Sequence, residues 1–91
     1  MLSRDRRDTP LEVVFICTAN RARSPLAEAL LRRYTAATDC RVRSAGVLGS
    51  GSLPALEDAI EAGRRLGVDL SHHRSRPLPA AGLNSVDLVV G

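Results

Sequence analysis

The feature that most constrains the fold is a seven-residue run at 11–17, LEVVFIC, which is rich in β-branched and aromatic residues. Such a run is typical of a strand buried on both faces, as in a parallel sheet. A polar loop at 18–23 follows, and "SPLAEALLRRY" then carries helix-start signals, with Ser24 as N-cap and Pro25 at the first helical position. Leucines and alanines recur with a helical period, which predicts a helix to about Thr35.

The rest of the chain continues this alternation. The predicted elements are a strand at 40–47, a flexible loop at 49–54, a helix at 54–67 ended by Gly67, an irregular basic loop at 68–79 and a strand at 85–91. The order β-α-β-α-β predicts an α/β fold, three-layered, with a short parallel sheet and right-handed crossovers. Residues 1–10 are predicted to be a flexible polar tail, and 11–91 one domain.

Composition narrows the class of partner. The chain has 91 residues, of which 44% are hydrophobic, so it can bury a modest single core. All basic residues are arginine, but they are scattered among acidic residues, as on a solvated surface. Phe15 and Tyr34 are the aromatic residues, which disfavours a stacking platform for single-stranded nucleic acid. We therefore expect no nucleic-acid partner.

Cysteine usage and hydropathy bear on the compartment. Cys17 and Cys40 are too few for a disulfide framework, and no spacing indicates zinc, so we expect no metal and no cofactor. The charged start of the chain lacks the apolar segment of a signal peptide, and no apolar run has the length of a membrane span. These patterns predict a cytoplasmic protein that does not bind membranes.

The loop after the first strand is the predicted site, since α/β sheets bind ligands beyond the carboxyl ends of their strands. Cys17 is followed by five residues and then by Arg23 and Ser24. Loop N–H groups, the helix N-terminus and the Arg23 guanidinium together favour a tetrahedral oxyanion. They would also lower the pKa of Cys17 and make it a nucleophile toward phosphorus. The predicted binding residues are Thr18, Ala19, Asn20, Arg21, Ala22 and Arg23.

Three residues of this loop carry open or secondary expectations. Ser24 either caps the helix, donates to the Cys17 sulfur, or does both. Asn20 lies where left-handed backbone is often needed, which asparagine tolerates. Arg21 is expected to be exposed near the mouth of the site rather than catalytic.

"VVFICTANRARSPLAEAL" resembles the phosphate-binding signature of the low-molecular-weight protein tyrosine phosphatases, a family that includes a branch of arsenate reductases. "RSAG" at 43–46, "GVDLSHHRSRPL" at 67–78 and "VDLVV" at 86–90 resemble the second strand, the His-x-x-Arg loop and the third strand of that family. The resemblance covers about residues 11–91.

The resemblance implies a role for each matching position. Cys17 would become phosphocysteine, Arg23 would bind the phosphoryl group and Ser24 would aid the thiolate. Asn20 would hold the loop through a network with Ser44 and a histidine. His73 fits that histidine best because Arg76 follows it at the family spacing, and His72 is the fallback.

The chain also departs from the family pattern. Ala19 replaces a usual glycine, Ala22 replaces a common loop cysteine, and no aromatic residue follows "SAGV", which puts phosphotyrosine specificity in doubt. The family carries its general acid, an aspartate, in its last third, and this sequence stops at Gly91. We therefore expect the acid, the final strand and the closing helices to be absent. Asp87 would lie within the third strand and is a poor substitute.

Three functions remain open. The first is a cysteine-dependent phosphatase that acts on phosphotyrosine or similar aryl phosphates, impaired by the lack of a general acid. The second is an arsenate reductase that uses an external thiol, with Cys40 as a less favoured resolving thiol. The third is a non-catalytic module that binds phosphate or a phosphorylated protein. A bare third-strand edge and an uncovered sheet face further predict either a homodimer through that surface or a marginal fold.

Overall fold

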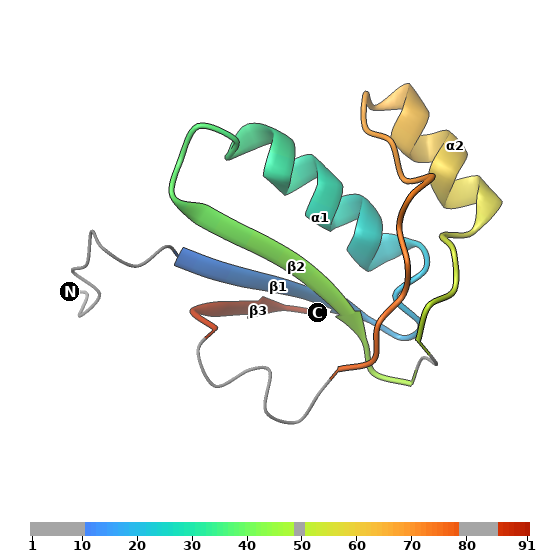
Figure 1. Ribbon diagram of the computed structural model, residues 1–91, viewed down its shortest axis with the longest axis horizontal. Coiled ribbons are helices and arrows are strands. Elements are labelled where there is room, and N and C mark those ends of the chain that lie inside the picture. Colours follow the sequence, from blue (N-terminus) through green and yellow to red (C-terminus); the bar gives the residue numbers. More distant parts are fainter. Residues whose placement is uncertain (1–10, 49–50, 79–85) are drawn as a thin grey trace.

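The computed structural model describes residues 11–48, 51–78 and 86–91. Its elements are β1 (Leu11–Cys17), α1 (Arg23–Tyr34), β2 (Cys40–Gly46), α2 (Glu57–Arg65) and β3 (Leu88–Val90). The predicted α/β class and the β-α-β-α-β order are confirmed (Figure 1). The predicted tail at 1–10, part of the loop at 49–54 and residue 85 of the third strand lie outside the described residues.

The three strands form one parallel sheet in the order β2-β1-β3. β1 pairs with β2 along its whole length, from Leu11 opposite Cys40 to Cys17 opposite Gly46. The neighbouring residues Val13 and Val14 point to opposite faces, and they are 4% and 3% exposed. The prediction that the first strand is buried on both faces is therefore confirmed at the centre of β1.

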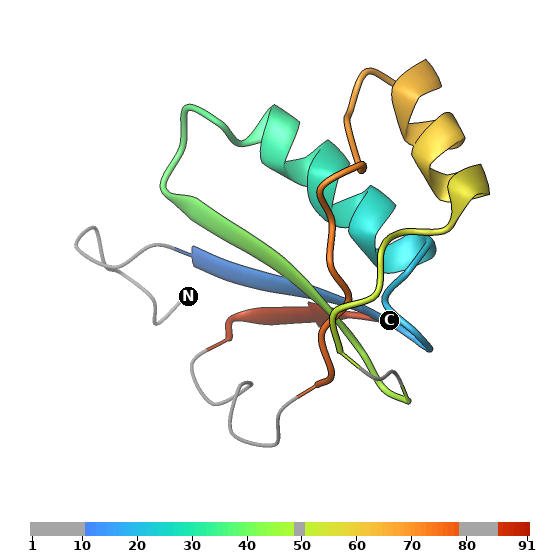
Figure 2. The same ribbon diagram turned by 45° about the vertical axis from the view of Figure 1, so that its right-hand side comes forward.

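The helices do not contact the sheet equally. α1 packs against β1 and β2, whereas α2 packs against α1 and contacts no strand in the described part of the chain. Both helices lie above the sheet in Figures 1 and 2. Within the described ranges α1 alone lies directly on the sheet, so the second helical layer of the expected three-layer arrangement is not seen there. None of the described helices is long and apolar enough to cross a membrane.

α1 begins two residues earlier than predicted, at Arg23 rather than Pro25, and its N-cap is not Ser24. The cap position is Ala22, and no side chain makes a capping hydrogen bond there. Ser24 lies inside the helix and is buried, with its hydroxyl bonded to the Cys17 sulfur. The capping prediction for Ser24 is thus wrong, because this hydroxyl is engaged by the loop.

α2 is shorter than the predicted 54–67. Pro54 forms a bridge with Arg74, and the Leu56 N–H donates to the Arg21 carbonyl, so the chain stays extended until Glu57. At the other end, Gly67 has φ +88° and its N–H bonds to the Arg64 carbonyl. This left-handed turn confirms Gly67 as the residue that ends the helix.

The two outer strands are also shorter than predicted. β2 ends at Gly46 rather than at 47, and the Gly46 N–H and C=O also bond to the main chain of Arg76 and Leu78. β3 covers Leu88–Val90 rather than 85–91. Asp87 precedes it, and its carboxylate accepts a hydrogen bond from the Glu12 N–H at 2.8 Å.

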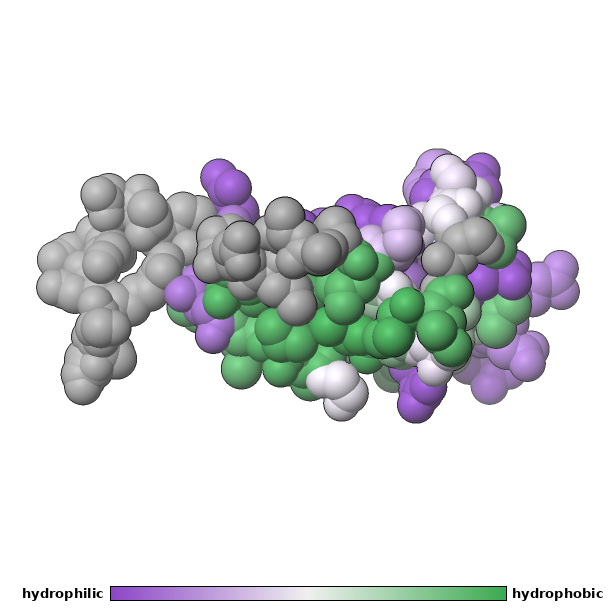
Figure 3. All heavy atoms as spheres, turned by 90° about the horizontal axis from the view of Figure 1, so that it is seen from below, coloured by the Kyte–Doolittle hydropathy of each residue, from purple (hydrophilic) through white to green (hydrophobic). Residues whose placement is uncertain are grey.

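Apolar side chains gather on the side of the molecule away from the helices (Figure 3). All three residues of β3 are exposed, Leu88 by 53%, Val89 by 46% and Val90 by 36%. β3 pairs only with β1 in the described residues, so its outer edge is free there. The bare third-strand edge predicted from the sequence is present in this part of the chain.

Candidate active site

The loop between β1 and α1 lies at the carboxyl end of the central strand, beside the end of β2. Gly46 is the point of closest approach between them. A Cβ atom at Gly46 would lie 2.9 Å from the Ala19 carbonyl carbon and 3.0 Å from the Asn20 nitrogen. Glycine is therefore required here so that the loop can close over the strand end.

The Cys17 sulfur lies in a ring of hydrogen-bond donors. The Ser24 Oγ is 3.0 Å from it and the Asn20 backbone nitrogen is 3.3 Å from it. Burial raises the pKa of this thiol, but the Ser24 hydroxyl and three backbone N–H groups outweigh burial and lower the pKa from 9.0 to about 7. The three N–H groups belong to Ser24, Asn20 and Ala19. Near neutral pH a large fraction of Cys17 is therefore thiolate.

Asn20 holds the loop in shape. Its φ of +58° is the left-handed backbone that the sequence predicted, and its side chain is fully buried. Its Nδ2 donates to the hydroxyls of Ser24 and Ser44, each at 2.8 Å. The loop thus rests on a buried amide that reaches both α1 and β2.

The segment after α2 completes this network. The His73 Nε2 lies 2.8 Å from the Asn20 carbonyl oxygen, and the Arg76 backbone N–H donates to Asn20 Oδ1 at 2.9 Å. Arg76 therefore contacts the loop through its main chain, while its side chain is exposed. His72 points away, exposed and 3.7 Å from Asp69. Of the two predicted histidines, the structure brings His73 to the loop.

The two arginines of the loop differ. Arg23 is exposed at the start of α1, and its guanidinium has no protein partner within the described residues. Arg21 instead donates from Nε to the Pro54 carbonyl at 2.8 Å, which ties the loop to the segment before α2. Arg23 is thus the guanidinium available to a ligand at this helix N-terminus.

The remaining predicted loop residues contribute main chain. Thr18 and Ala19 are exposed, and the Thr18 carbonyl accepts the Leu48 N–H at 2.9 Å. The Ala22 carbonyl accepts the first helical hydrogen bond of α1, from Leu26 at 3.1 Å.

Two residues weighed from the sequence lie at the other end of the sheet. Cys40 pairs with Leu11, and the strand advances about 3.3 Å per residue, so Cys40 is roughly 20 Å from Cys17 along β1. A disulfide needs Cα atoms within about 7 Å, so Cys40 cannot resolve Cys17 of the same chain. Asp87 lies beside Glu12, also far from the loop, so it does not replace a general acid.

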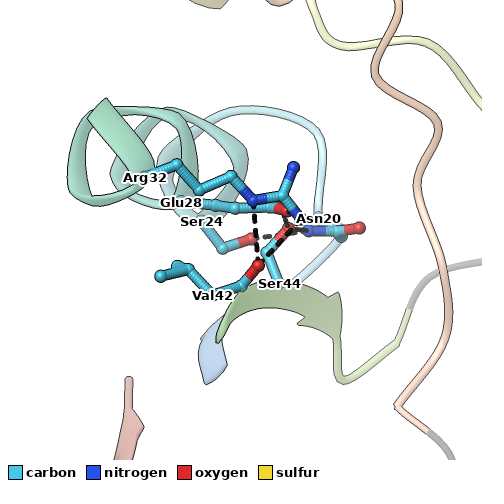
Figure 4. A network of polar contacts seen from close by, with 6 residues as sticks. All are labelled: Asn20, Ser24, Glu28, Arg32, Val42 and Ser44. Carbon is cyan, nitrogen blue, oxygen red and sulfur yellow. Dashed lines mark hydrogen bonds and ion pairs between the residues drawn. The ribbon is translucent and has the colours of Figure 1, made fainter. Parts of the chain in front are cut away.

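The sequence reasoning missed two residues that support the site, Glu28 and Arg32 (Figure 4). Glu28 is 4% exposed, and its Oε1 accepts a hydrogen bond from the Ser44 hydroxyl at 2.5 Å. Arg32 pairs with the other carboxylate oxygen at 2.7 Å. A signal was present: Glu28 is one helical turn after Ser24, so it shares the inward face of α1.

The family model described as low molecular weight phosphotyrosine protein phosphatase matches residues 12–91. A crystal structure of a low molecular weight protein tyrosine phosphatase from T. tengcongensis superposes with a TM-score of 0.79 at 36% identity, over 87% of this chain and 56% of that one.

Curated relatives carry three activities in their names. A probable low molecular weight protein-tyrosine-phosphatase, EpsP of Ralstonia solanacearum, is 36% identical over 86% of this chain and 52% of its own length. A protein-arginine-phosphatase of Bacillus subtilis is 38% identical (88% and 54%), and an arsenate reductase of the same species is 35% identical (86% and 53%). The chain spans about half the length of these relatives. With its matched signature and fold, the chain belongs to the low-molecular-weight protein tyrosine phosphatase family.

Proposed function

We propose that this chain hydrolyses aryl phosphate monoesters, such as phosphotyrosine, through a phosphocysteine on Cys17. The observation that carries the proposal is the donor ring around the Cys17 sulfur, which lowers its pKa to about 7 at the N-terminus of α1. A thiolate in such a ring is a nucleophile held where a dianion binds. The same donors would stabilise the equatorial oxygens of the phosphoryl group in the transition state.

The reaction has two steps. In the first, the thiolate of Cys17 attacks phosphorus, a P–S bond forms and the P–O bond to the aryl oxygen breaks. The Arg23 guanidinium holds two phosphoryl oxygens, and Ser24 supports the sulfur. In the second, a water oxygen attacks phosphorus, a P–O bond forms as the P–S bond breaks, and both protons of the water leave with dihydrogen phosphate. The thiolate is thereby regenerated and accepts the hydrogen bond from Ser24.

The leaving group decides how much a general acid matters. Asp87, which the sequence analysis considered as a substitute general acid, lies beside Glu12 at the amino end of β1. A general acid that protonates the leaving group changes the rate by about 10²–10⁴-fold when that group is poor. An aryl oxide leaves more readily than an alkoxide, so aryl phosphates depend less on such an acid.

The test is turnover of p-nitrophenyl phosphate by the full chain, with mass spectrometry to trap phosphocysteine. Cys17→Ser should abolish turnover and the adduct, whereas Cys40→Ser, at the far end of the sheet, should retain both. Formation of phosphocysteine without turnover would support Cys17 as the nucleophile but would contradict the proposed hydrolysis step. A folded chain with neither would contradict the proposal and leave a phosphate-binding module.

An arsenate reductase is the second candidate, favoured by the named relative of Bacillus subtilis. The same thiolate would attack arsenic, and a thiol would then release arsenite. Because Cys40 cannot reach Cys17, that thiol must come from outside the chain. Arsenate reduction that depends on added thiol, with no release of p-nitrophenol, would favour this function.

The compartment and the oligomeric state are proposed on structural grounds. Both cysteines are free, and a nucleophilic thiolate needs a reducing environment, so we place the chain in the cytoplasm. We also propose that a second copy pairs along the outer edge of β3, which has no partner strand among the described residues and whose side chains are exposed and apolar.

A further inference from the structure

A chain of polar side chains runs from the surface of α1 to Ser24 (Figure 4), whose hydroxyl contacts the Cys17 sulfur. Its members are Arg32, Glu28, Ser44, Asn20 and Ser24, in that order. Four of them are nearly inaccessible, with Glu28 4% exposed, Ser24 2%, Ser44 1% and Asn20 0%. Buried polar groups destabilise a fold unless each finds a partner, and here each contacts the next.

The contact between Arg76 and Asn20 fixes which groups of the network donate and which accept. The Arg76 backbone N–H can only donate, so the Asn20 atom 2.9 Å away is the amide oxygen. The Asn20 amide nitrogen therefore faces the two hydroxyls and donates to both. Ser24 accepts from Asn20, which leaves its own hydrogen for the sulfur at 3.0 Å.

The other hydroxyl is oriented by a charge. A carboxylate can only accept, so the Ser44 hydroxyl donates its one hydrogen to Glu28, 2.5 Å away. Ser44 therefore accepts the hydrogen bond from Asn20. Glu28 is held in turn by Arg32, whose Nη2 lies 2.7 Å from its second oxygen. Arg32 is itself fixed to β2, since its Nε and Nη2 donate to the Val42 carbonyl at 3.0 and 2.8 Å.

We propose that Arg32 and Glu28 are positioning residues for Cys17: their ion pair holds Ser44 as an acceptor for Asn20, and Asn20 holds Ser24 as the donor to the Cys17 thiolate. The inference rests on the proposed function in taking Cys17 as the nucleophile. Loss of Arg32 would leave the buried Glu28 carboxylate without its cation, which favours movement of the Glu28 side chain. Ser44 would then no longer be committed as an acceptor, and the donation to sulfur would weaken.

Glu28 and Arg32 line a groove, and other charged side chains line the same groove. They are Arg33, Asp69, His72, His73, Arg74 and Arg76. Their influence on the Cys17 thiolate must be distinguished from that of the Arg32–Glu28 ion pair. Arg33 is the natural control, because it neighbours Arg32 on α1 but donates to the carbonyls of Leu66 and Gly67, outside the network. Arg32→Gln and Arg33→Gln each remove one positive charge from the same helix.

The experiment follows the rate of Cys17 alkylation by iodoacetamide against pH, in a Cys40→Ala background where Cys17 is the one thiol. Arg32→Gln should raise the pH midpoint of Cys17 alkylation by about half a pH unit or more. Arg33→Gln should leave this midpoint unchanged, and Arg32→Lys should return it most of the way to the wild-type value. The Arg32 side chain is 58% exposed, so the variant should fold, and a thermal melt checks this. An unmoved midpoint, or equal shifts in Arg32→Gln and Arg33→Gln, would overturn the proposal.

A double-mutant cycle gives a second, independent reading. Ser44→Ala cuts the chain between Glu28 and Asn20, so Arg32→Gln should add no further shift in that background. Additive shifts would show that Arg32 acts by another route and would overturn the proposal. Alkylation uses no phosphorylated substrate, so these outcomes are independent of whether the chain hydrolyses p-nitrophenyl phosphate.

Discussion

At the scale of single residues, Cys17 and Asn20 have complementary tasks. Cys17 supplies the sulfur, and Asn20 supplies the backbone bend that turns loop N–H groups toward it. A non-glycine residue at φ +58° is uncommon, and asparagine is among the residues that adopt it most readily. The buried amide then uses both hydrogens and its oxygen within the fold. The conformation and the hydrogen bonds are thus provided by one side chain.

The lowered pKa of Cys17 predicts a pH-dependent stability. Between about pH 7 and 9 the folded chain has lost the thiol proton while the unfolded chain retains it, so stability should rise with pH across this window. The contribution is fully present above the unfolded pKa of 9.0 and is lost as the pH falls through about 7. Urea unfolding of the wild type and Cys17→Ala at several pH values measures it. A stability difference that stays constant with pH would contradict the prediction.

At the scale of elements, the site depends on where β1, β2 and α1 end. β1 delivers Cys17, α1 begins without a side-chain cap at Ala22, and β2 ends at Gly46, against the loop. An uncapped helix N-terminus leaves N–H donors free for an anion. The residue that the sequence predicted as the cap, Ser24, serves the sulfur instead. Element ends, rather than element interiors, build this site.

Gly46→Ala tests that packing. The new methyl would lie 2.9 Å from the Ala19 carbonyl carbon, closer than carbon atoms approach without a shift, so the loop must move. We expect a loss of about 1–3 kcal/mol in unfolding free energy and weaker binding of inorganic phosphate. Urea unfolding and isothermal titration measure the two effects.

Gly51→Ala is the control for exchanging glycine for alanine, because its methyl would come no closer than 3.3 Å to the Pro77 ring. Equal phosphate affinity in Gly46→Ala and the wild type would show that the loop tolerates the methyl. In that case the close approach at Gly46 would not define the site.

At the scale of the whole molecule, the sheet is asymmetric. β2 and β1 pair over seven residues and carry α1, whereas β3 pairs over three and all of its residues are exposed. A free edge with exposed apolar side chains is a template for pairing with another strand. We therefore expect this surface to mediate the association of two copies of the chain.

Sedimentation velocity should detect a dimer of the full chain, and Val89→Arg should shift it to monomer, since a charge on an edge strand opposes pairing. Leu66→Arg places the same charge on another exposed apolar position, after α2, and should leave the dimer intact. A wild-type chain that sediments as a folded monomer at all concentrations would rule out this interface.

The amino-acid sequence by itself determined the local events. β-branched residues at 11–17 specify a buried strand, Pro25 lies in the first turn of a helix, Gly67 ends one, and Asn20 accepts left-handed backbone. Each follows from the covalent and steric preferences of a few neighbouring residues, so the type and order of these elements were predicted, although α1 begins two residues before the predicted start. The spacing of Cys17, Arg23 and Ser24 belongs to the same class, because one loop and one helical turn bring them together.

Tertiary structure alone decided which distant groups meet. His73, rather than His72, reaches Asn20 because the segment after α2 pairs with Gly46 and therefore runs beside the loop. Glu28 and Arg32 join the site because α1 packs its inward face on β2. Cys40 is excluded because parallel register places it at the opposite end of the sheet from Cys17. Contacts between residues far apart in sequence depend on register and packing, which local preferences do not encode.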